Sequence, residues 1–269
     1  MSKSIDEIIL QHSTRGMNIL QKKHSKEHCK EAAGAFKKLE NGVVFLYTGF
    51  YVEGFGETDG PIGTYFLALA LNSLGYKSVI ITDKFCQDYF KEIETLYIPL
   101  DGYSQEYYYA ILEEYNPICH FSIERCGKNI DGLYTNLNKE SITKFTAPLD
   151  DLFVLGGKTK PTFAIGDGGN ELGMGNFSDS VIKYLSISPC AIESDFPIIA
   201  TVSNWGAYGF IAYLDSSLLP SFDDVDKYLG FIVGLGSIDG VSKKSEKTVD
   251  GKEWIIEKDI LEELKKALT

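Results

Sequence analysis

The chain has 269 residues, of which 44% are hydrophobic and 24% charged, which is typical of a folded globular protein and excludes disorder as its main state. The 26 Lys and Arg residues against 38 Asp and Glu give a formal net charge of −12, so a nucleic-acid partner, which requires a clustered cationic surface, is not expected. The apolar runs, such as Val43–Tyr47, are far shorter than the roughly 20 residues that cross a bilayer, so no membrane association is expected either.

The N-terminal residues carry neither the apolar core of a secretory signal nor the Arg-rich, acid-free character of a transit peptide. We therefore expect a cytoplasmic protein, with the mitochondrial matrix as the alternative if the source is eukaryotic. Five cysteines, an odd number without a CxxC pair, predict free thiols: Cys29, Cys86, Cys119, Cys126 and Cys190.

The first predicted elements are helices. Ser4 and Glu7 form a capping-box pattern ahead of an apolar run, which predicts a helix from there to about Leu20. A second helix is predicted over Lys22–Leu39.

From Gly42 onward, short β-branched and aromatic runs alternate with helical segments, which is typical of βαβ units. The predicted strands are Val43–Tyr47, Ser78–Thr82, Thr95–Leu100, Ile118–Ile123, Thr162–Ile165 and Ile198–Val202. Their mostly apolar character indicates that both faces of the sheet are covered. We predict an α/β fold: a doubly wound, Rossmann-like, mainly parallel sheet of about six or more strands with helices on both faces, in one domain spanning residues 1–269.

The helix predicted at Pro61–Leu74 has proline in its first turn, glycine just beyond its end and an almost wholly apolar centre, so we expect it to be buried. Another helix contains Tyr107–Tyr109. Later helices are predicted at Ser178–Leu185, Trp205–Leu214, Asp223–Val233 and Glu257–Leu268. The stretch Lys139–Pro161 is the least regular part of the middle of the chain.

Polar residues follow the predicted strands, at the edge where ligands gather in an open parallel sheet. Glu57 and Asp59 precede the buried helix, and helix capping would account for only one of these two acids. Further polar groups after later strands are Asp83, Glu124, Arg125, Asp131 and the Ser203–Asn204 pair. The loop Gly166–Gly175 has five glycines in ten residues together with Asp167, Asn170 and Glu171, which is the strongest local signal in the chain.

Acids after several strands would concentrate negative charge in one crevice, which is costly unless a cation compensates it. Oxygen-rich, histidine-poor ligands favour Mg²⁺ or Mn²⁺ over zinc. The glycine-rich loop matches neither the Walker A nor the dinucleotide pattern, which disfavours nucleotide binding but leaves a phosphate contact at Gly168 and Gly169 open. The Asp239–Gly240 and Asp250–Gly251 pairs are interpreted as turns.

Five segments resemble the D-glutamate cyclase-like C-terminal domain family: Thr48–Gly63, Ile123–Asn136, Gly166–Gly175, Ser203–Gly209 and Gly236–Gly251. The resemblance implies a lyase that cyclises D-glutamate to 5-oxo-D-proline and water, and an α/β domain with an acidic, metal-binding pocket. The acids that would form this pocket are Glu57, Asp59, Asp83, Glu124, Asp131, Asp167 and Glu171. A divalent-metal-dependent phosphatase or hydrolase is the alternative enzyme, and a non-catalytic metal- or ligand-binding module is the second alternative.

We assign these residues roles as hypotheses, with a small amino acid as the partner and a homodimer left open. The divalent metal, Mg²⁺ or Mn²⁺, would be held by Asp59, Asp167, Glu171 and Asp83. Glu57 or Glu124 would act as the base, and Arg125 would hold the α-carboxylate of the substrate. Asn170, Asn204, Gly168 and Gly169 would bind and orient it. In the phosphatase alternative the same pocket would hold a phosphate ester on the metal.

Overall fold

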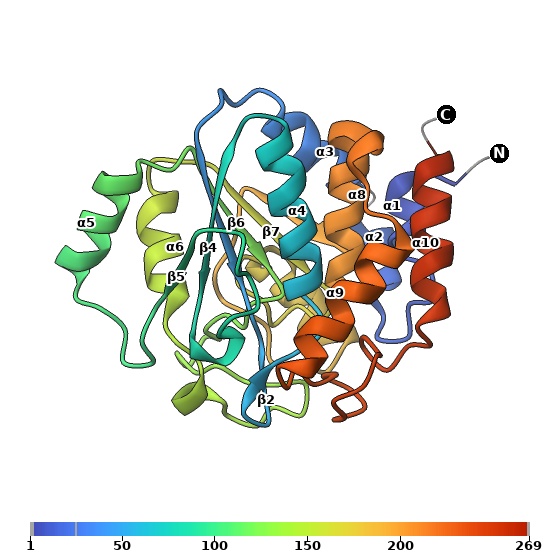
Figure 1. Cartoon of the computed structure of the whole chain (residues 1–269). Helices are drawn as coiled ribbons and strands as arrows, with labels where there is room; N and C mark the ends of the chain where they lie inside the picture. Colours follow the sequence, from blue (N-terminus) through green and yellow to red (C-terminus); the bar gives the residue numbers. More distant parts are fainter. Residues whose placement is uncertain (1–2, 25, 268–269) are drawn as a thin grey trace.

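The computed structural model describes residues 3–24 and 26–267, and within them the largest sheet is parallel and six-stranded (Figure 1). Its strands are β1 (Val43–Thr48), β4 (Lys77–Thr82), β5 (Thr95–Tyr97), β6 (Cys119–Ile123), β7 (Thr162–Gly166) and β8 (Phe196–Ile199). They lie in the order β5-β4-β1-β6-β7-β8, with β1 paired to β4 and β6. The predicted doubly wound α/β class is confirmed.

Helices cover both faces of the sheet, and successive residues of β1 show the alternation. Val44 and Leu46 pack into a core under α3 (His28–Phe36), α4 (Pro61–Ser73) and α8 (Ser203–Asp215). Phe45 and Tyr47 pack into the opposite core, under α5 (Gln105–Tyr115) and α6 (Leu149–Gly157). This is the period of two that a strand buried on both sides requires.

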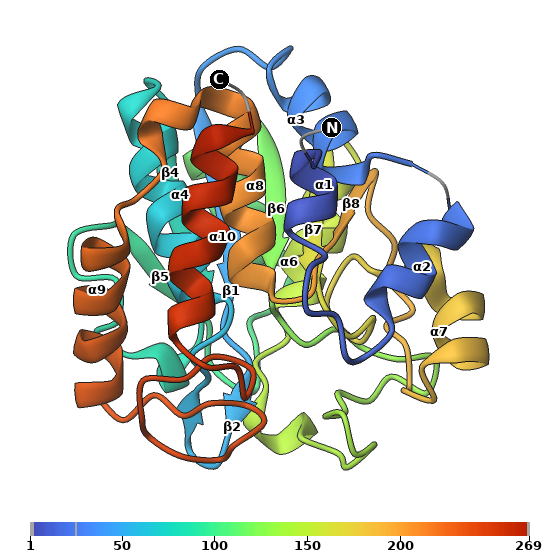
Figure 2. The same ribbon diagram turned by 90° about the vertical axis from the view of Figure 1, so that its right-hand side faces the viewer.

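A further layer covers α4 and α8. The helices α9 (Phe222–Gly234) and α10 (Ile255–Lys266) lie outside them, as Figure 2 shows for α10 in front of α8. Near the β8 edge of the sheet, α2 (Met17–His24) contacts α7 (Ser178–Tyr184), and α1 (Ile5–Ile8) packs on α3 and α8.

The predicted opening helix is wrong beyond its first turns. The Ser4–Glu7 capping box is present, but α1 ends at Ile8, and α2 begins only at Met17. The intervening turn has positive φ at His12 (56°) and Gly16 (92°), which no continuous helix allows. The helix predicted over Lys22–Leu39 is likewise two helices, α2 and α3, on either side of the undescribed residue 25.

Other boundaries differ less. The irregular stretch 139–161 contains α6, which the sequence did not predict, and β8 begins two residues before its predicted start. A two-residue hairpin, β2 (Tyr51–Val52) with β3 (Phe55–Gly56), follows β1. The predicted end of the last helix, Leu268, lies outside the described residues.

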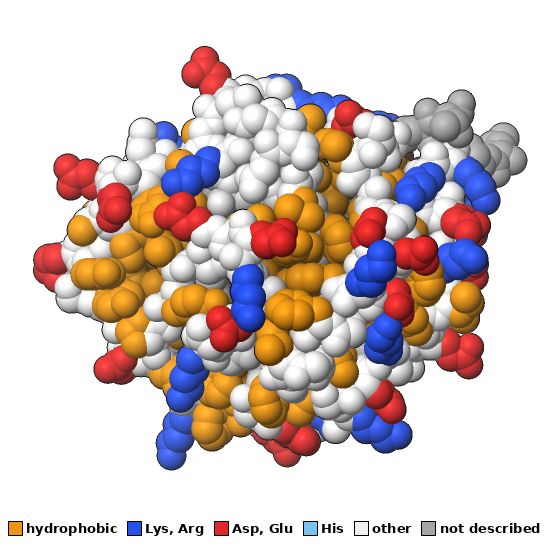
Figure 3. Space-filling model, in the orientation of Figure 1, with side chains coloured by type: hydrophobic (Ala, Val, Ile, Leu, Met, Phe, Trp, Pro, Cys, Tyr) orange, Lys and Arg blue, Asp and Glu red, His pale blue; other side chains and the backbone are white. Residues whose placement is uncertain are grey.

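The five cysteines are free, as predicted, and all five are buried. Among residues 3–24 and 26–267, no helix is both long enough and apolar enough to span a membrane. The face in Figure 3 carries side chains of both charges around a central hydrophobic area, where α4 and α9 lie in Figure 1.

Candidate functional site

Three carboxylates from distant parts of the chain meet at the carboxyl ends of the strands. Asp59 precedes α4, Glu124 follows β6 and Asp167 follows β7. One oxygen of each lies within 4.8 Å of the others, and all three residues are buried. Parallel strands direct the segments after them to the same edge of the sheet, so this meeting is the outcome that the fold predicts.

Asp59 is fixed in place by the first residues of α8. Its oxygens accept hydrogen bonds from the backbone N–H groups of Ser203 and Asn204, each at 2.8 Å. In return, Oδ1 of Asn204 accepts from the N–H groups of Gly60 (2.9 Å) and Gly63 (2.7 Å) at the start of α4. The Asn204 side chain is thereby used in helix capping, and its Nδ2 donates to the carbonyl oxygen of Thr58 (3.2 Å).

Glu124 is aimed into the cluster by an unusual backbone conformation. Its φ of 46° lies in the left-handed region, which costs free energy in a residue other than glycine. The hydroxyl of Ser203 donates to its Oε2 at 2.6 Å. A Cβ atom on Gly60 would stand 2.6 Å from Cβ of Glu124, so the turn before α4 requires glycine there.

The glycine-rich loop folds around its own carboxylate. Glu171 accepts hydrogen bonds from the backbone N–H groups of Gly168 (2.7 Å) and Gly169 (2.6 Å). Both amides are therefore occupied by Glu171, and neither is left for the ligand contact predicted from the sequence. Glu171 shapes the loop that carries Asp167.

Two further residues at this site, Arg15 and Asp250, were not predicted. Nη2 of Arg15 donates to Oδ2 of Asp167 and to Oδ2 of Asp250, and both carboxylates are nearly inaccessible to solvent. From the sequence, Asp250 is interpreted as a turn residue, and Arg15 is predicted to lie inside the opening helix. One signal was available: the chain has only two arginines, Arg15 and Arg125, among its 26 basic residues, and both lie at this end of the sheet.

Asp83 and Arg125 form a separate buried ion pair. Nη1 of Arg125 lies 2.7 Å from Oδ2 of Asp83, with 1% and 3% of the two side chains exposed. The guanidinium also donates to the carbonyl oxygens of Gly49 (2.7 Å) and Ala147 (2.6 Å). These contacts hold together the segments after β1, β4 and β6. The structure therefore joins Asp83 to Arg125 and not to the three-carboxylate cluster, while Asp131 is exposed.

A cavity of about 420 Å³ opens onto the cluster, within the range of small-molecule sites. Arg15, Glu57, Glu124, Asn170 and Asp250 line it. Asn170 donates through Nδ2 to the carbonyl oxygen of Thr135 at 2.9 Å, whereas its buried Oδ1 has no hydrogen-bond partner among the residues described. A buried acceptor without a donor at a cavity wall suits a ligand that supplies one.

Burial raises the pKa values of Glu57 and of the three clustered acids. Burial, followed by the charges of Asp59 and Asp250, raises the pKa of Glu57 well above its usual value. Burial and Asp250 raise the pKa of Asp59 to about 7. The pKa values of Glu124 and Asp167 are raised too, chiefly by burial, and Arg15 opposes the rise at Asp167. The site thus holds more negative charge than Arg15 balances.

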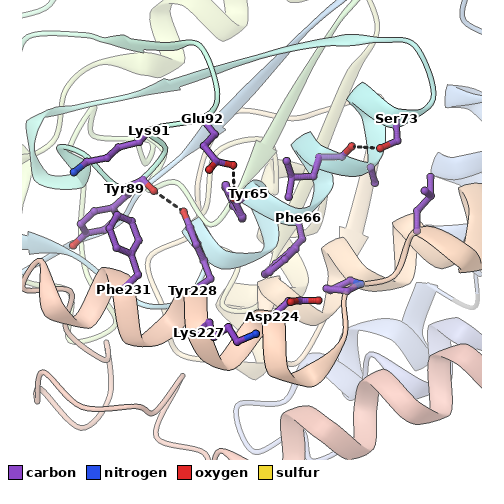
Figure 4. A pocket seen from close by; sticks show the side chains of 14 residues that line it. Tyr65, Phe66, Ser73, Tyr89, Lys91, Glu92, Asp224, Lys227, Tyr228 and Phe231 are labelled. Carbon is purple, nitrogen blue, oxygen red and sulfur yellow. Dashed lines mark hydrogen bonds between the residues drawn. The ribbon is translucent and has the colours of Figure 1, made fainter.

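A larger cavity, of about 610 Å³, lies between α4 and α9. Figure 4 shows it lined by aromatic rings, among them Tyr65 and Tyr228, which stack with centroids 4.0 Å apart. The hydroxyl of Tyr228 donates to the carbonyl oxygen of Tyr89, and that of Tyr65 to Glu92. None of the clustered acids reaches this groove, so the smaller, acidic cavity is the candidate site.

Known proteins resemble this chain to very different degrees. The chain is 35% identical over 181 residues to a human protein named "D-glutamate cyclase, mitochondrial", a match that covers 59% of this chain and 29% of the human protein. A crystal structure of RecJ with Mn²⁺ from Thermus thermophilus shares 13% identity and a TM-score of 0.38, covering 79% of this chain and 24% of RecJ, which is too weak a likeness for argument. The family described as "D-glutamate cyclase-like, C-terminal" matches residues 5–265. The chain belongs to the D-glutamate cyclase-like C-terminal family.

Proposed function

We propose that this protein cyclises D-glutamate to 5-oxo-D-proline and water in the acidic cavity. Membership of the family and the name of the human relative support this reaction. The match spans 29% of that relative, so the activity of the whole human protein is only proposed for this chain. The same name supports a mitochondrial location over a cytoplasmic one if the chain is eukaryotic.

The reaction joins two groups of one molecule. The α-ammonium group gives up two protons, its nitrogen attacks the γ-carboxyl carbon to form a C–N bond, a C–O bond breaks, and the oxygen leaves as water with those two protons. At neutral pH the amine is protonated and the carboxylate is a poor electrophile, so the site must remove a proton from the amine and neutralise the γ-carboxylate. It must also fold the substrate so that the reacting atoms meet.

Asp59, Glu124 and Asp167 suit a hard divalent cation, and this buried cluster is the observation that carries the proposal. Their oxygens lie within 4.8 Å of one another. A hard divalent cation would be held by several carboxylate oxygens that converge on one point, which is what these three residues offer. The excess of buried negative charge also favours a cation. Mg²⁺ or Mn²⁺ held there would neutralise the γ-carboxylate and stabilise the negative charge that develops on its oxygens.

Glu57 is the proposed base. Its carboxylate lines the cavity, and its raised pKa brings its proton affinity closer to that of an amine than an exposed glutamate allows. The unpartnered Oδ1 of Asn170 is the proposed acceptor for an N–H of the substrate amine. Glu124, predicted as an alternative base, is assigned to the cation because its oxygen belongs to the cluster.

The experiment is an assay of 5-oxoproline formed from D-glutamate by the full chain with Mn²⁺ or Mg²⁺, with and without chelator. L-glutamate and p-nitrophenyl phosphate serve as competing substrates. We expect 5-oxoproline from D-glutamate, loss of the product with chelator, and a fall of at least about 100-fold in Asp167→Asn. The control Glu113→Gln removes an exposed carboxylate of α5, far from the cavity, and keeps its rate.

Hydrolysis of the phosphate ester without formation of 5-oxoproline would replace this proposal with the phosphatase alternative. Tight Mn²⁺ binding without turnover of any of the three compounds would indicate a binding module instead. A fully active Asp167→Asn protein would remove the cluster from the reaction.

A further inference from the structure

Arg15 lines the acidic cavity, and its guanidinium is held there by two carboxylates of the protein. Nη2 is taken up by Asp167 and Asp250, which fix the plane of the group. Within the described part of the chain, no hydrogen bond engages Nε or Nη1, and 22% of the side chain stays exposed at the cavity wall. A guanidinium held in this way keeps its positive charge and free N–H donors on Nε and Nη1, each of which can give a carboxylate one charge-assisted hydrogen bond.

The second arginine cannot do the same. Arg125 is 1% exposed, and its Nη atoms are used by Asp83 and by the carbonyl oxygens of Gly49 and Ala147. It does not line the acidic cavity. Another basic side chain must therefore bind the α-carboxylate, a role that the sequence predicts for Arg125.

Two basic side chains line the cavity, Arg15 and Lys243. Lys243 is exposed and makes no ion pair within 4.0 Å to a described residue, so nothing fixes its ammonium group. Arg15 is anchored beside the three-carboxylate cluster through Asp167. If Asp167 bound a divalent cation together with Asp59 and Glu124, less of its negative charge would be left to balance the positive charge of Arg15. The guanidinium could then attract an anion from the cavity.

We propose that Arg15 binds the α-carboxylate of the substrate and is the residue by which the site selects a free α-carboxylate, an inference that rests on the proposed function. The γ-carboxylate then faces the cluster, at the opposite end of the same small molecule. The turn at residues 9–16, which interrupts the predicted opening helix, delivers Arg15 to the cavity.

The test compares the binding of two ligands by calorimetry, using the full chain loaded with Mn²⁺. D-glutamate carries the α-carboxylate, and D-isoglutamine carries an α-carboxamide in its place. One charge-assisted hydrogen bond from Arg15 predicts that the wild type prefers D-glutamate by about 10- to 100-fold. We expect Arg15→Ala to bind both ligands with the same low affinity. Arg15→Lys keeps the positive charge beside Asp167 and Asp250, and we expect it to fold and to lose most of the preference.

Lys243→Ala is the matched control, and we expect it to keep the wild-type preference. A preference that survives in Arg15→Ala or in a folded Arg15→Lys, or that is lost in Lys243→Ala alone, would overturn the inference. An Arg15-dependent preference without formation of 5-oxoproline would overturn the proposed reaction and keep Arg15 as the carboxylate anchor. Formation of 5-oxoproline with an unchanged ligand preference in the Arg15 variants would overturn the role of Arg15 and keep the proposed reaction. A wild type that binds neither ligand would overturn both the reaction and the role of Arg15.

Discussion

Asp59, which precedes α4, caps α8, and Asn204, at the start of α8, caps α4. Each side chain thus satisfies backbone N–H groups of the helix that the other begins. The two helices also approach closely, because a Cβ on Gly63 would lie 2.8 Å from Cα of Asn204. These mutual hydrogen bonds make the position of Asp59, a proposed cation ligand, depend on how the two buried helices pack together.

The first prediction is that Asn204→Ala lowers stability without removing the cation site. It leaves the buried N–H group of Gly63 without its acceptor and that of Gly60 with Asp59 alone, which lowers the free energy of unfolding by about 1–3 kcal/mol. Urea titration of the metal-free protein measures the loss, and calorimetry should show nearly unchanged Mn²⁺ affinity. The control Ser104→Ala removes an exposed cap of α5 and costs about 1 kcal/mol. A large loss of Mn²⁺ affinity in folded Asn204→Ala would contradict this division of roles.

The strands could be predicted from the sequence because both faces of the sheet are buried. A run such as Val43–Tyr47 is hydrophobic throughout and too short for a helix, so its pattern leaves little choice. The order β5-β4-β1-β6-β7-β8 is not contained in such local patterns. It depends on how each crossover helix packs on the sheet.

The sequence was sufficient to predict at which edge of the sheet the candidate site lies. Acids after the strands were expected to meet there, and Asp59, Glu124 and Asp167 do. Which acid joins the cluster depends on side-chain directions that no spacing encodes, so Asp83 could not be separated from the others. Arg15 was missed because the capping box at Ser4 favoured a helix continuing through it, whereas the chain turns at Gly16.

The second prediction concerns pH. A carboxyl whose pKa is higher in the folded protein than in the unfolded chain stabilises the fold at low pH, and this contribution is lost as the pH rises through the folded pKa. Glu57 has such a raised pKa and makes no hydrogen bond through its carboxylate to a described residue. Glu57→Gln should therefore unfold at a higher temperature than the wild type at pH 8, with no advantage at pH 4, in thermal scans without metal.

The histidines contribute equally to the pH dependence of stability in the variant and in the wild type, so they do not affect this comparison. Burial lowers the pKa of His28 to about 4 and that of His120 to about 3 in both proteins. These two groups lose their contribution as the pH falls, the opposite sign to Glu57. If Glu57→Gln raised the unfolding temperature equally at pH 4 and pH 8, the negative charge of Glu57 would not be what destabilises the folded protein.

The third prediction is stabilisation by a divalent cation. At a Mn²⁺ concentration 100 times its Kd, binding adds about 2.7 kcal/mol, which raises Tm by roughly 5–11 °C. The rise should be smaller at pH 5.5, because Asp59, whose pKa is raised to about 7, then holds a proton that competes with the cation. Thermal scans with and without chelator measure it, and Asp167→Asn should abolish it. An undiminished rise in that variant would place the cation elsewhere.

The fourth prediction separates Asp83 and Arg125 from the cation. Arg125→Met leaves the buried carboxylate of Asp83 without its partner and should cost about 3–5 kcal/mol in urea titrations. The double variant Asp83→Asn, Arg125→Met removes both charges and should recover much of this loss. Its Mn²⁺ affinity should match that of the wild type. A double variant that folds stably and no longer binds Mn²⁺ would return Asp83 to the ligand set.

The last prediction concerns the unpartnered oxygen of Asn170. Asn170→Ala removes that acceptor together with the hydrogen bond to Thr135, which costs about 1 kcal/mol of stability. If the substrate amine donates to Oδ1, calorimetry with Mn²⁺ present should show D-glutamate binding about 10-fold weaker, at unchanged Mn²⁺ affinity. The control Asn176→Ala removes two hydrogen bonds to Ser194 outside the cavity, so it should lower stability and leave D-glutamate affinity intact. Equal D-glutamate affinities in the two variants would mean that the free oxygen of Asn170 does not face the substrate.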